Sequence, residues 1–148
     1  MRRIIKVTRE KEVNVPIEKV FNFVAEYGNT LKYTPYLVRF DPTTESKRGS
    51  GARFRMVGKV FGIPFKSELE VFEFVENRSL RLETISGSQI RIQWLFRPTE
   101  KGTRVVYTTE YTVPLGFAGA IVGGLILRRF LHQGSKKTLR KLKALLEK

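Results

Sequence analysis

Few residues in this chain have side chains that can carry out acid–base or nucleophilic chemistry. His132 is the only histidine, and there is no cysteine. A zinc site of the usual kind needs several nitrogen or sulfur ligands, so we expect no metal centre and no cofactor. No serine stands in a G-x-S-x-G context, which disfavours a serine hydrolase. His132 is therefore the one histidine available as a candidate general acid or base.

The surroundings of His132 in the sequence are polar on one helical stripe. Arg128, His132 and Ser135 are spaced as i, i+4 and i+7, which places them on the same side of a helix. If that stripe faces an internal cavity, His132 could transfer a proton or hold a ligand carbonyl or hydroxyl. The alternative is that all three residues lie at the solvent edge of an amphipathic helix.

Hydroxyl groups also gather on one face of the segment 103–113, which alternates as a strand does. Tyr107, Thr109 and Tyr111 share this face. They could anchor a polar group of a ligand, or their hydroxyls could be satisfied inside the sheet. The same alternation predicts further strands at 3–15, 51–60, 65–75 and 90–97. In 65–75 the alternation slips, which predicts a bulge or strong bend.

Three helices are expected beside these strands. Pro16 suits the first turn of a helix that ends at Gly28 and Asn29. Residues 30–36 predict a second, short helix or turn, in which Leu31, Tyr33 and Tyr36 act as lids rather than core. Residues 114–148 predict one long helix that begins between Gly116 and Gly119. One face of this helix carries Leu127, Leu131, Leu142 and Leu145.

This order of elements predicts an α+β fold in one domain, residues 1–148, because the strands and helices are segregated along the chain. We expect a curved antiparallel sheet of about six or seven strands, with two short helices, and a long C-terminal helix closing a hydrophobic cavity. An ordinary packed core is the alternative. The residues expected to face the cavity are Phe54, Met56, Leu82, Ile92, Trp94, Tyr107, Tyr111, Leu127 and Leu131.

The succession of motifs resembles the START-like superfamily with the helix-grip fold, also called SRPBCC, which includes polyketide cyclase/dehydrase-like and coenzyme Q-binding-like proteins. The resemblance covers essentially the whole chain. It rests on VNVPIEKVFNFVAEY (13–27), KYTPYL, GARFRM, ENRSLRL, EKGTRVVYTTEY and TLRKLKALLEK. It implies binding of a hydrophobic molecule in the cavity, but the same fold hosts carriers, sensors and enzymes. No catalytic motif of the family is present to be carried over.

The chain is strongly basic, with a net charge of +14. Residues 128–148 hold eight Lys or Arg against a single Glu, a net charge of +7, which is half of the total. This stretch could be a solvated helix face or could bind an anionic surface. Nucleic-acid binding is disfavoured because the aromatic residues are expected to point inward rather than to offer a stacking surface.

The segment 115–127 is apolar and rich in glycine. Its thirteen residues are too few for a membrane span, which needs about 20. It could be a gate, a membrane-contact surface or simply the core-facing start of the helix. The N-terminus has no apolar run of the kind that a signal peptide needs. We therefore expect a cytoplasmic protein, with peripheral contact to an anionic membrane as a possibility.

These observations leave three hypotheses. The first is a non-enzymatic binder or carrier of a hydrophobic small molecule such as a lipid, quinone or polyketide-like compound. The second is a polyketide cyclase/dehydrase-like enzyme that uses His132 or an inner tyrosine. The third is a protein that binds anionic surfaces, membrane or nucleic acid, through its basic residues.

Overall fold

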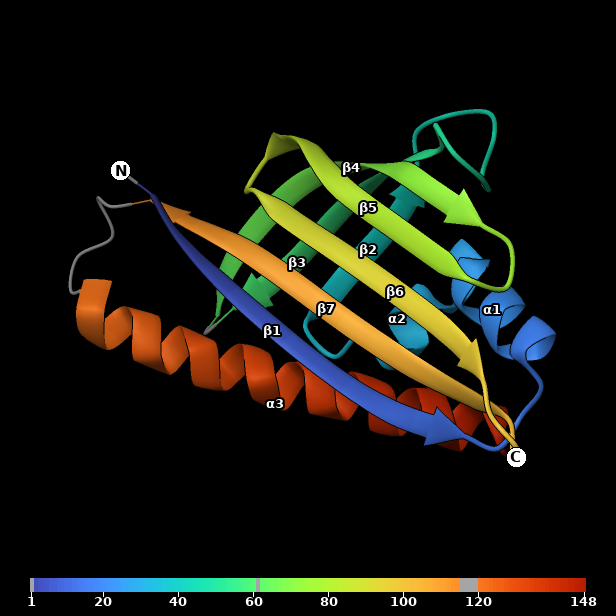
Figure 1. The fold of residues 1–148 in the computed structure, drawn as a ribbon. Helices are drawn as coiled ribbons and strands as arrows, with labels where there is room; N and C mark the ends of the chain where they lie inside the picture. Colours follow the sequence, from blue (N-terminus) through green and yellow to red (C-terminus); the bar gives the residue numbers. More distant parts are fainter. Residues whose placement is uncertain (1, 61, 115–119) are drawn as a thin grey trace.

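The computed structural model describes residues 2–60, 62–114 and 120–148 of the chain (Figure 1). Seven strands and three α-helices follow one another in the expected order, with one turn of 3-10 helix, η1, between the first two α-helices. The elements are β1 (Arg2–Val13), α1 (Ile17–Ala25), η1 (Tyr27–Asn29), α2 (Thr30–Tyr33), β2 (Leu37–Pro42), β3 (Arg53–Val60), β4 (Ile63–Val75), β5 (Ser79–Gly87), β6 (Ile90–Pro98), β7 (Thr103–Pro114) and α3 (Ala120–Leu146).

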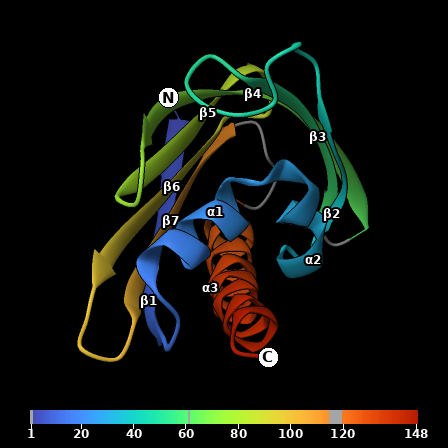
Figure 2. The same ribbon diagram turned by 90° about the vertical axis from the view of Figure 1, so that its right-hand side faces the viewer.

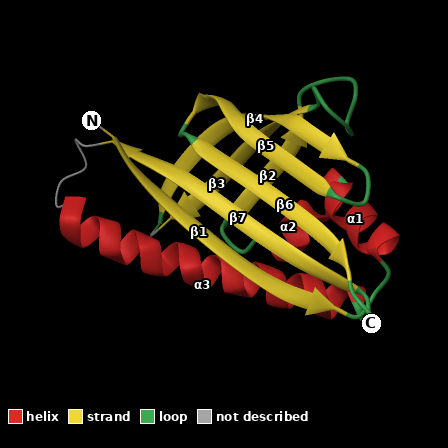
Figure 3. Ribbon diagram, in the orientation of Figure 1, coloured by secondary structure: helices red, strands yellow, loops and turns green. Residues whose placement is uncertain are grey.

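The strands form one antiparallel sheet in the order β1-β7-β6-β5-β4-β3-β2. Strands β2 to β7 are sequential neighbours, and β1 pairs with β7 along its whole length, from Arg2 opposite Pro114 to Val13 opposite Thr103. Figure 2 shows the sheet curving around α3, with α1 and α2 in the concavity beside that helix. Figure 3 shows the three α-helices on the same side of the sheet. The predicted helix-grip architecture is confirmed.

The curvature of the sheet has a local cause in β4. The pairing of β4 with β5 shifts register between Glu68 and Leu69 and again between Val71 and Glu73. Each shift is an irregularity of the bulge type, which bends and twists a strand. The slip in the alternation of 65–75 therefore marks a real bend. It lets β3 and β2 approach the helices instead of continuing a flat sheet.

The first helix lies where the sequence predicts it but ends earlier than expected. Val20, Phe21 and Val24 are buried, and Pro16 occupies the N-cap position. The α-helix stops at Ala25, and η1 carries the chain onward to Asn29. An extended backbone at Glu26, rather than the Gly28–Asn29 pair, ends the helix.

The expectation that Tyr33 acts as a lid is wrong. Its side chain is only 3% exposed, and its ring lies edge-on to Trp94 with 5.8 Å between the ring centroids. The segment 30–36 is too short to display a helical period, so its buried side was not visible in the sequence. In the fold, α2 packs against α3 and thereby turns Tyr33 into the core.

Helix α3 lies along β1 and α2. Its C-terminal half enters the main core, where Leu139, Leu142 and Leu146 are buried together with Trp94 and Tyr107. The predicted helix start between Gly116 and Gly119 lies outside the described residues. Among the described residues, no helix combines the length and the apolar character that a membrane span requires.

Candidate ligand-binding site

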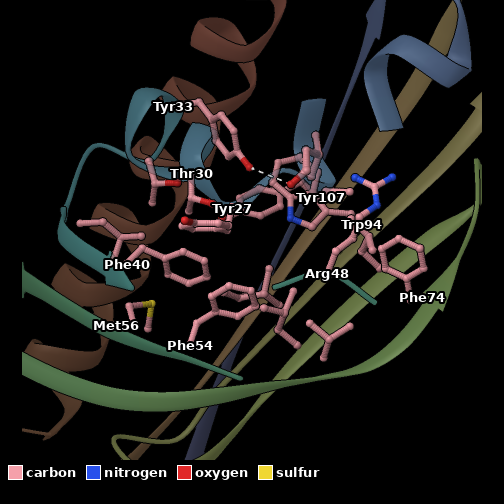
Figure 4. Close-up of a pocket in the computed structure, with 18 of the residues that line it drawn as sticks. Tyr27, Thr30, Tyr33, Phe40, Arg48, Phe54, Met56, Phe74, Trp94 and Tyr107 are labelled. Carbon is pink, nitrogen blue, oxygen red and sulfur yellow. Dashed lines mark hydrogen bonds between the residues drawn. The ribbon is translucent and has the colours of Figure 1, made fainter. Parts of the chain in front are cut away.

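A cavity of about 70 Å³ lies between the concave face of the sheet and the segment from α1 to β2 (Figure 4). The inner faces of β3 to β7 form one wall, because alternate residues of each strand point into the concavity. The side chains of this wall are Phe54, Met56, Val71, Phe74, Leu80, Leu82, Ile92, Trp94, Tyr107 and Tyr111.

The opposite wall comes from the short helices and the start of β2. It combines apolar side chains with threonine and tyrosine hydroxyls. It consists of Val24, Ala25, Tyr27, Thr30, Tyr33, Thr34, Tyr36, Leu37 and Phe40. Aromatic rings dominate this side: Phe40 stacks on Phe54 with 4.8 Å between centroids, and Tyr27 lies 5.8 Å from Phe54 (Figure 4).

Five tyrosines contribute hydroxyl groups to the lining of the cavity. The Tyr33 hydroxyl donates a weak hydrogen bond to the carbonyl oxygen of Val24 at 3.5 Å. The hydroxyls of Tyr36 and Tyr111 are 3.4 Å apart. Burial raises the pKa of Tyr33, Tyr36, Tyr107 and Tyr111 above the ordinary value for tyrosine. All four hydroxyls therefore stay protonated near neutral pH and act as neutral hydrogen-bonding groups.

The mouth of the cavity is formed by the loop that carries Lys47, Arg48 and Gly49. The Arg48 guanidinium lies over the ring of Phe74, 5.4 Å from its centroid, and donates a hydrogen bond to Oδ1 of Asn22 at 2.6 Å. A cation held against an aromatic ring in this way is stabilised by the ring quadrupole. Arg48 thus ties the loop to α1 and β4 across the opening.

The structure brings together seven of the nine residues that the sequence placed at a cavity. Those seven are Phe54, Met56, Leu82, Ile92, Trp94, Tyr107 and Tyr111. Leu127 and Leu131 are not among the lining residues. Leu131 is buried against Ile5 and Val7 of β1, and Leu127 packs on the same cluster. At this point the leucine face of α3 packs against β1, which is the edge strand of the sheet, and not against the cavity.

The polar stripe predicted around His132 does not face this cavity. His132 is half-buried and does not line it. Arg128 is exposed, whereas Ser135 is 3% exposed, so the three residues do not share one environment. Thr109, the other expected anchor, is 1% exposed, does not line the cavity, and its hydroxyl has no hydrogen-bond partner among the described residues.

Sequence reasoning missed the wall contributed by residues 24–37. The aromatic residues of that stretch were visible, but they lie in η1, a four-residue α2 and a loop, where no period assigns an inner face. The density of tyrosine was the available signal, because Tyr27, Tyr33 and Tyr36 fall within ten residues. Buried tyrosines of this kind suit a cavity that needs a few hydrogen-bonding groups.

Within the described parts of the chain, no cluster of His, Cys, Asp and Glu is arranged to hold a metal ion. The described lining residues also include no carboxylate and no imidazole. What the arrangement offers chemically is an apolar enclosure with neutral hydroxyl groups inside and two cations at its mouth.

Solved structures share this fold at low sequence identity. A protein from Thermus thermophilus superposes with a TM-score of 0.78 at 19% identity, covering 96% of this chain and 95% of the other. A START superfamily protein from Mycobacterium smegmatis gives 0.77 at 15%, covering 96% and 97%. The di-domain ARO/CYC StfQ from the steffimycin biosynthetic pathway gives 0.76 at 17%, covering 97% of this chain and 51% of StfQ.

Comparison with curated proteins finds no match. The family model described as "Polyketide cyclase / dehydrase and lipid transport" matches residues 5–147, from the first half of β1 to one residue beyond α3. This span contains every wall of the cavity. The chain therefore belongs to the polyketide cyclase/dehydrase and lipid transport family.

Proposed function

We propose that this protein binds a hydrophobic small molecule in the cavity between the sheet and the α1–β2 segment, and does so without chemical turnover. The observation that carries the proposal is the composition of the lining. Apolar and aromatic side chains enclose the space, and the polar atoms inside it are mainly hydroxyl groups that remain neutral. Such a lining favours a largely apolar ligand with a carbonyl or hydroxyl group near Tyr36, Tyr107 and Tyr111.

The size of the cavity adds a requirement. Ligand pockets typically measure about 300–1,000 Å³, whereas this one measures about 70 Å³. A lipid or a multi-ring compound therefore needs side chains of the lining to move apart. The contacts of Arg48 with Phe74 and Asn22 are the ones that an opening of the mouth would break.

The alternative of a cyclase/dehydrase-like enzyme finds less support. Proton abstraction near neutral pH needs a group whose pKa lies close to that range. The tyrosines of the described lining have their pKa raised by burial, so they can donate hydrogen bonds but are poor bases. The similarity in fold to the di-domain ARO/CYC StfQ is not evidence that this chain has the same activity, because one fold can host many functions.

The proposal is tested by filling the cavity. Leu82 lines it, and Ile85 lies on the same strand but is exposed. We expect Leu82→Phe to weaken binding of the neutral apolar dye N-phenyl-1-naphthylamine by about tenfold, since the added ring takes up space that the ligand needs. Ile85→Phe is the matched control and should bind as wild type does. Equal binding by both variants would contradict the proposal.

A further inference from the structure

A second hollow, of about 400 Å³, lies on the outside of the molecule between the α2–β2 connection and α3. Pro35 and Tyr36 form one side, Lys59 near the end of β3 another, and one side of α3 from Phe130 to Arg140 the third. We call it the basic groove. It is distinct from the internal cavity, because the two hollows share Tyr36 and no other described lining residue.

The charge of the basic groove is uncompensated. Four cations line it, Lys59 from the sheet and Lys136, Lys137 and Arg140 from α3, and no acidic residue does. None of the four has an ion-pair partner among the described residues, whereas Lys143, on the next turn of α3, pairs with Glu147. Like charges held around one concavity repel each other and focus a positive potential into it. An anion bound there would relieve that repulsion.

Tyr36 separates the basic groove from the internal cavity, because it lines both. On the groove side its ring lies 6.2 Å from the ring of Phe130. On the cavity side its hydroxyl meets the hydroxyl of Tyr111. Its backbone is fixed, since the Tyr36 carbonyl accepts a hydrogen bond from the Lys59 amide at 3.0 Å. Tyr36 is therefore the lining residue that the two spaces have in common.

We propose that the basic groove binds the anionic head of an amphiphilic ligand, a phosphate or carboxylate, whose apolar part passes Tyr36 into the internal cavity. This inference rests on the proposed function, and it names the class of ligand. Lys and Arg side chains are the usual partners of phosphate and carboxylate oxygens. An extended polyanion is a poorer match, because the four cations line one hollow that borders an apolar space at Tyr36.

The test compares two compounds with the same alkyl chain and different heads. Decan-1-ol and decyl phosphate, each below its micelle concentration, displace the neutral naphthylamine dye from the full-length protein. We expect decyl phosphate to bind about tenfold more tightly than decan-1-ol, as several charge-assisted contacts in a shared groove would give. In Lys136→Gln/Lys137→Gln this preference should disappear while decan-1-ol affinity stays unchanged.

The matched control is Lys19→Gln/Lys101→Gln, which removes the same charge from exposed positions outside both hollows. It should keep the preference for decyl phosphate. The inference is overturned if wild type binds the two compounds equally, or if the groove variant retains the preference. It is also overturned if inorganic phosphate alone binds as tightly as decyl phosphate, because the groove would then take a free anion. A protein that binds neither alkyl compound contradicts the proposed function as well.

Discussion

The hydroxyl of Tyr36, in the connection from α2 to β2, lies 3.4 Å from the hydroxyl of Tyr111 on β7. This contact joins the helical wall of the cavity to the sheet wall. On the groove side, the Tyr36 ring lies against the ring of Phe130 of α3. The Tyr36 side chain therefore lies between the internal cavity and the basic groove, both of which it lines.

Removing the Tyr111 hydroxyl should loosen this partition. In Tyr111→Phe the hydrogen bond to Tyr36 is lost, and the free energy of unfolding should fall by about 1 kcal/mol. The dissociation rate of the naphthylamine dye, measured by stopped flow, should rise. Tyr27→Phe is the control, because Tyr27 lines the same cavity and its hydroxyl has no described hydrogen bond. A dissociation rate that rises equally in the control would contradict the role of Tyr36.

Adding a methyl group at Gly134 should have the opposite effect. A Cβ at this position would lie 3.2 Å from Cε1 of Tyr36, so it would crowd the ring and restrict its movement. We expect Gly134→Ala to slow the association of decyl phosphate, whose alkyl chain is proposed to pass Tyr36. The change in melting temperature should be small, because the preference of a helix for alanine over glycine, about 1 kcal/mol, is opposed by the close contact of the new Cβ with Tyr36. An unchanged association rate in a folded variant would count against a moving Tyr36.

Replacing His132 should leave binding intact. His132 does not line the cavity, and it does not line the basic groove either. Dye affinity of His132→Ala is expected to stay within about twofold of wild type, the range of a substitution away from a site. Fluorescence titration checks this. A large loss of affinity would revive the sequence hypothesis that this histidine anchors a ligand.

Alkaline pH should unfold the protein through its buried tyrosines. Their folded-state pKa is raised above the unfolded value of 10.0, so their contribution to stability is complete below that value. It is lost as the pH rises from there through the folded pKa. Chemical denaturation across this range should show falling stability, with tyrosinate absorbance rising together with unfolding. Formation of tyrosinate by these four residues near pH 10.0 in a fully folded protein would contradict their burial.

The C-terminal half of α3 should matter more to stability than its described N-terminal end. Leu142 is fully buried in the main core, whereas Leu125 is 64% exposed. Leu142→Ala should cost about 2–5 kcal/mol, and Leu125→Ala should cost less than about 0.5 kcal/mol. Urea denaturation of the two variants provides the comparison. Similar losses of unfolding free energy in the two variants would contradict the burial of Leu142 and the exposure of Leu125.

The sequence predicted the strands well because the inner face of a strand is visible in its own alternation of apolar and polar residues. The alternation of Ile90, Ile92, Trp94 and Phe96 gave the strand β6 and its inner face, and the slip within 65–75 marked the bend in β4. The seven strand residues at the cavity followed from this alternation. Residues 24–37 contain no pattern as clear as this alternation, because their elements are too short to show a period.

Other features depend on contacts between distant segments. The leucine face of α3 could be recognised, but its partner could not, and Leu131 packs on β1 rather than at the cavity. Tyr33 is buried through contacts with distant segments, including Trp94 of β6. The basic run of α3 was visible as charge. Only the fold shows that this basic run lines one groove together with Lys59 and Tyr36.

Trp94 reports directly on whether the internal cavity binds an apolar molecule, since it is the only tryptophan in the chain and it lines the cavity. The measurement is a titration of the protein with N-phenyl-1-naphthylamine, followed by the emission of Trp94. If the cavity binds an apolar molecule, Trp94 emission should be quenched in a saturable way as one dye binds per chain, and Leu82→Phe should weaken the effect. Trp94 emission that stays constant while the dye binds would place the ligand elsewhere and contradict the account.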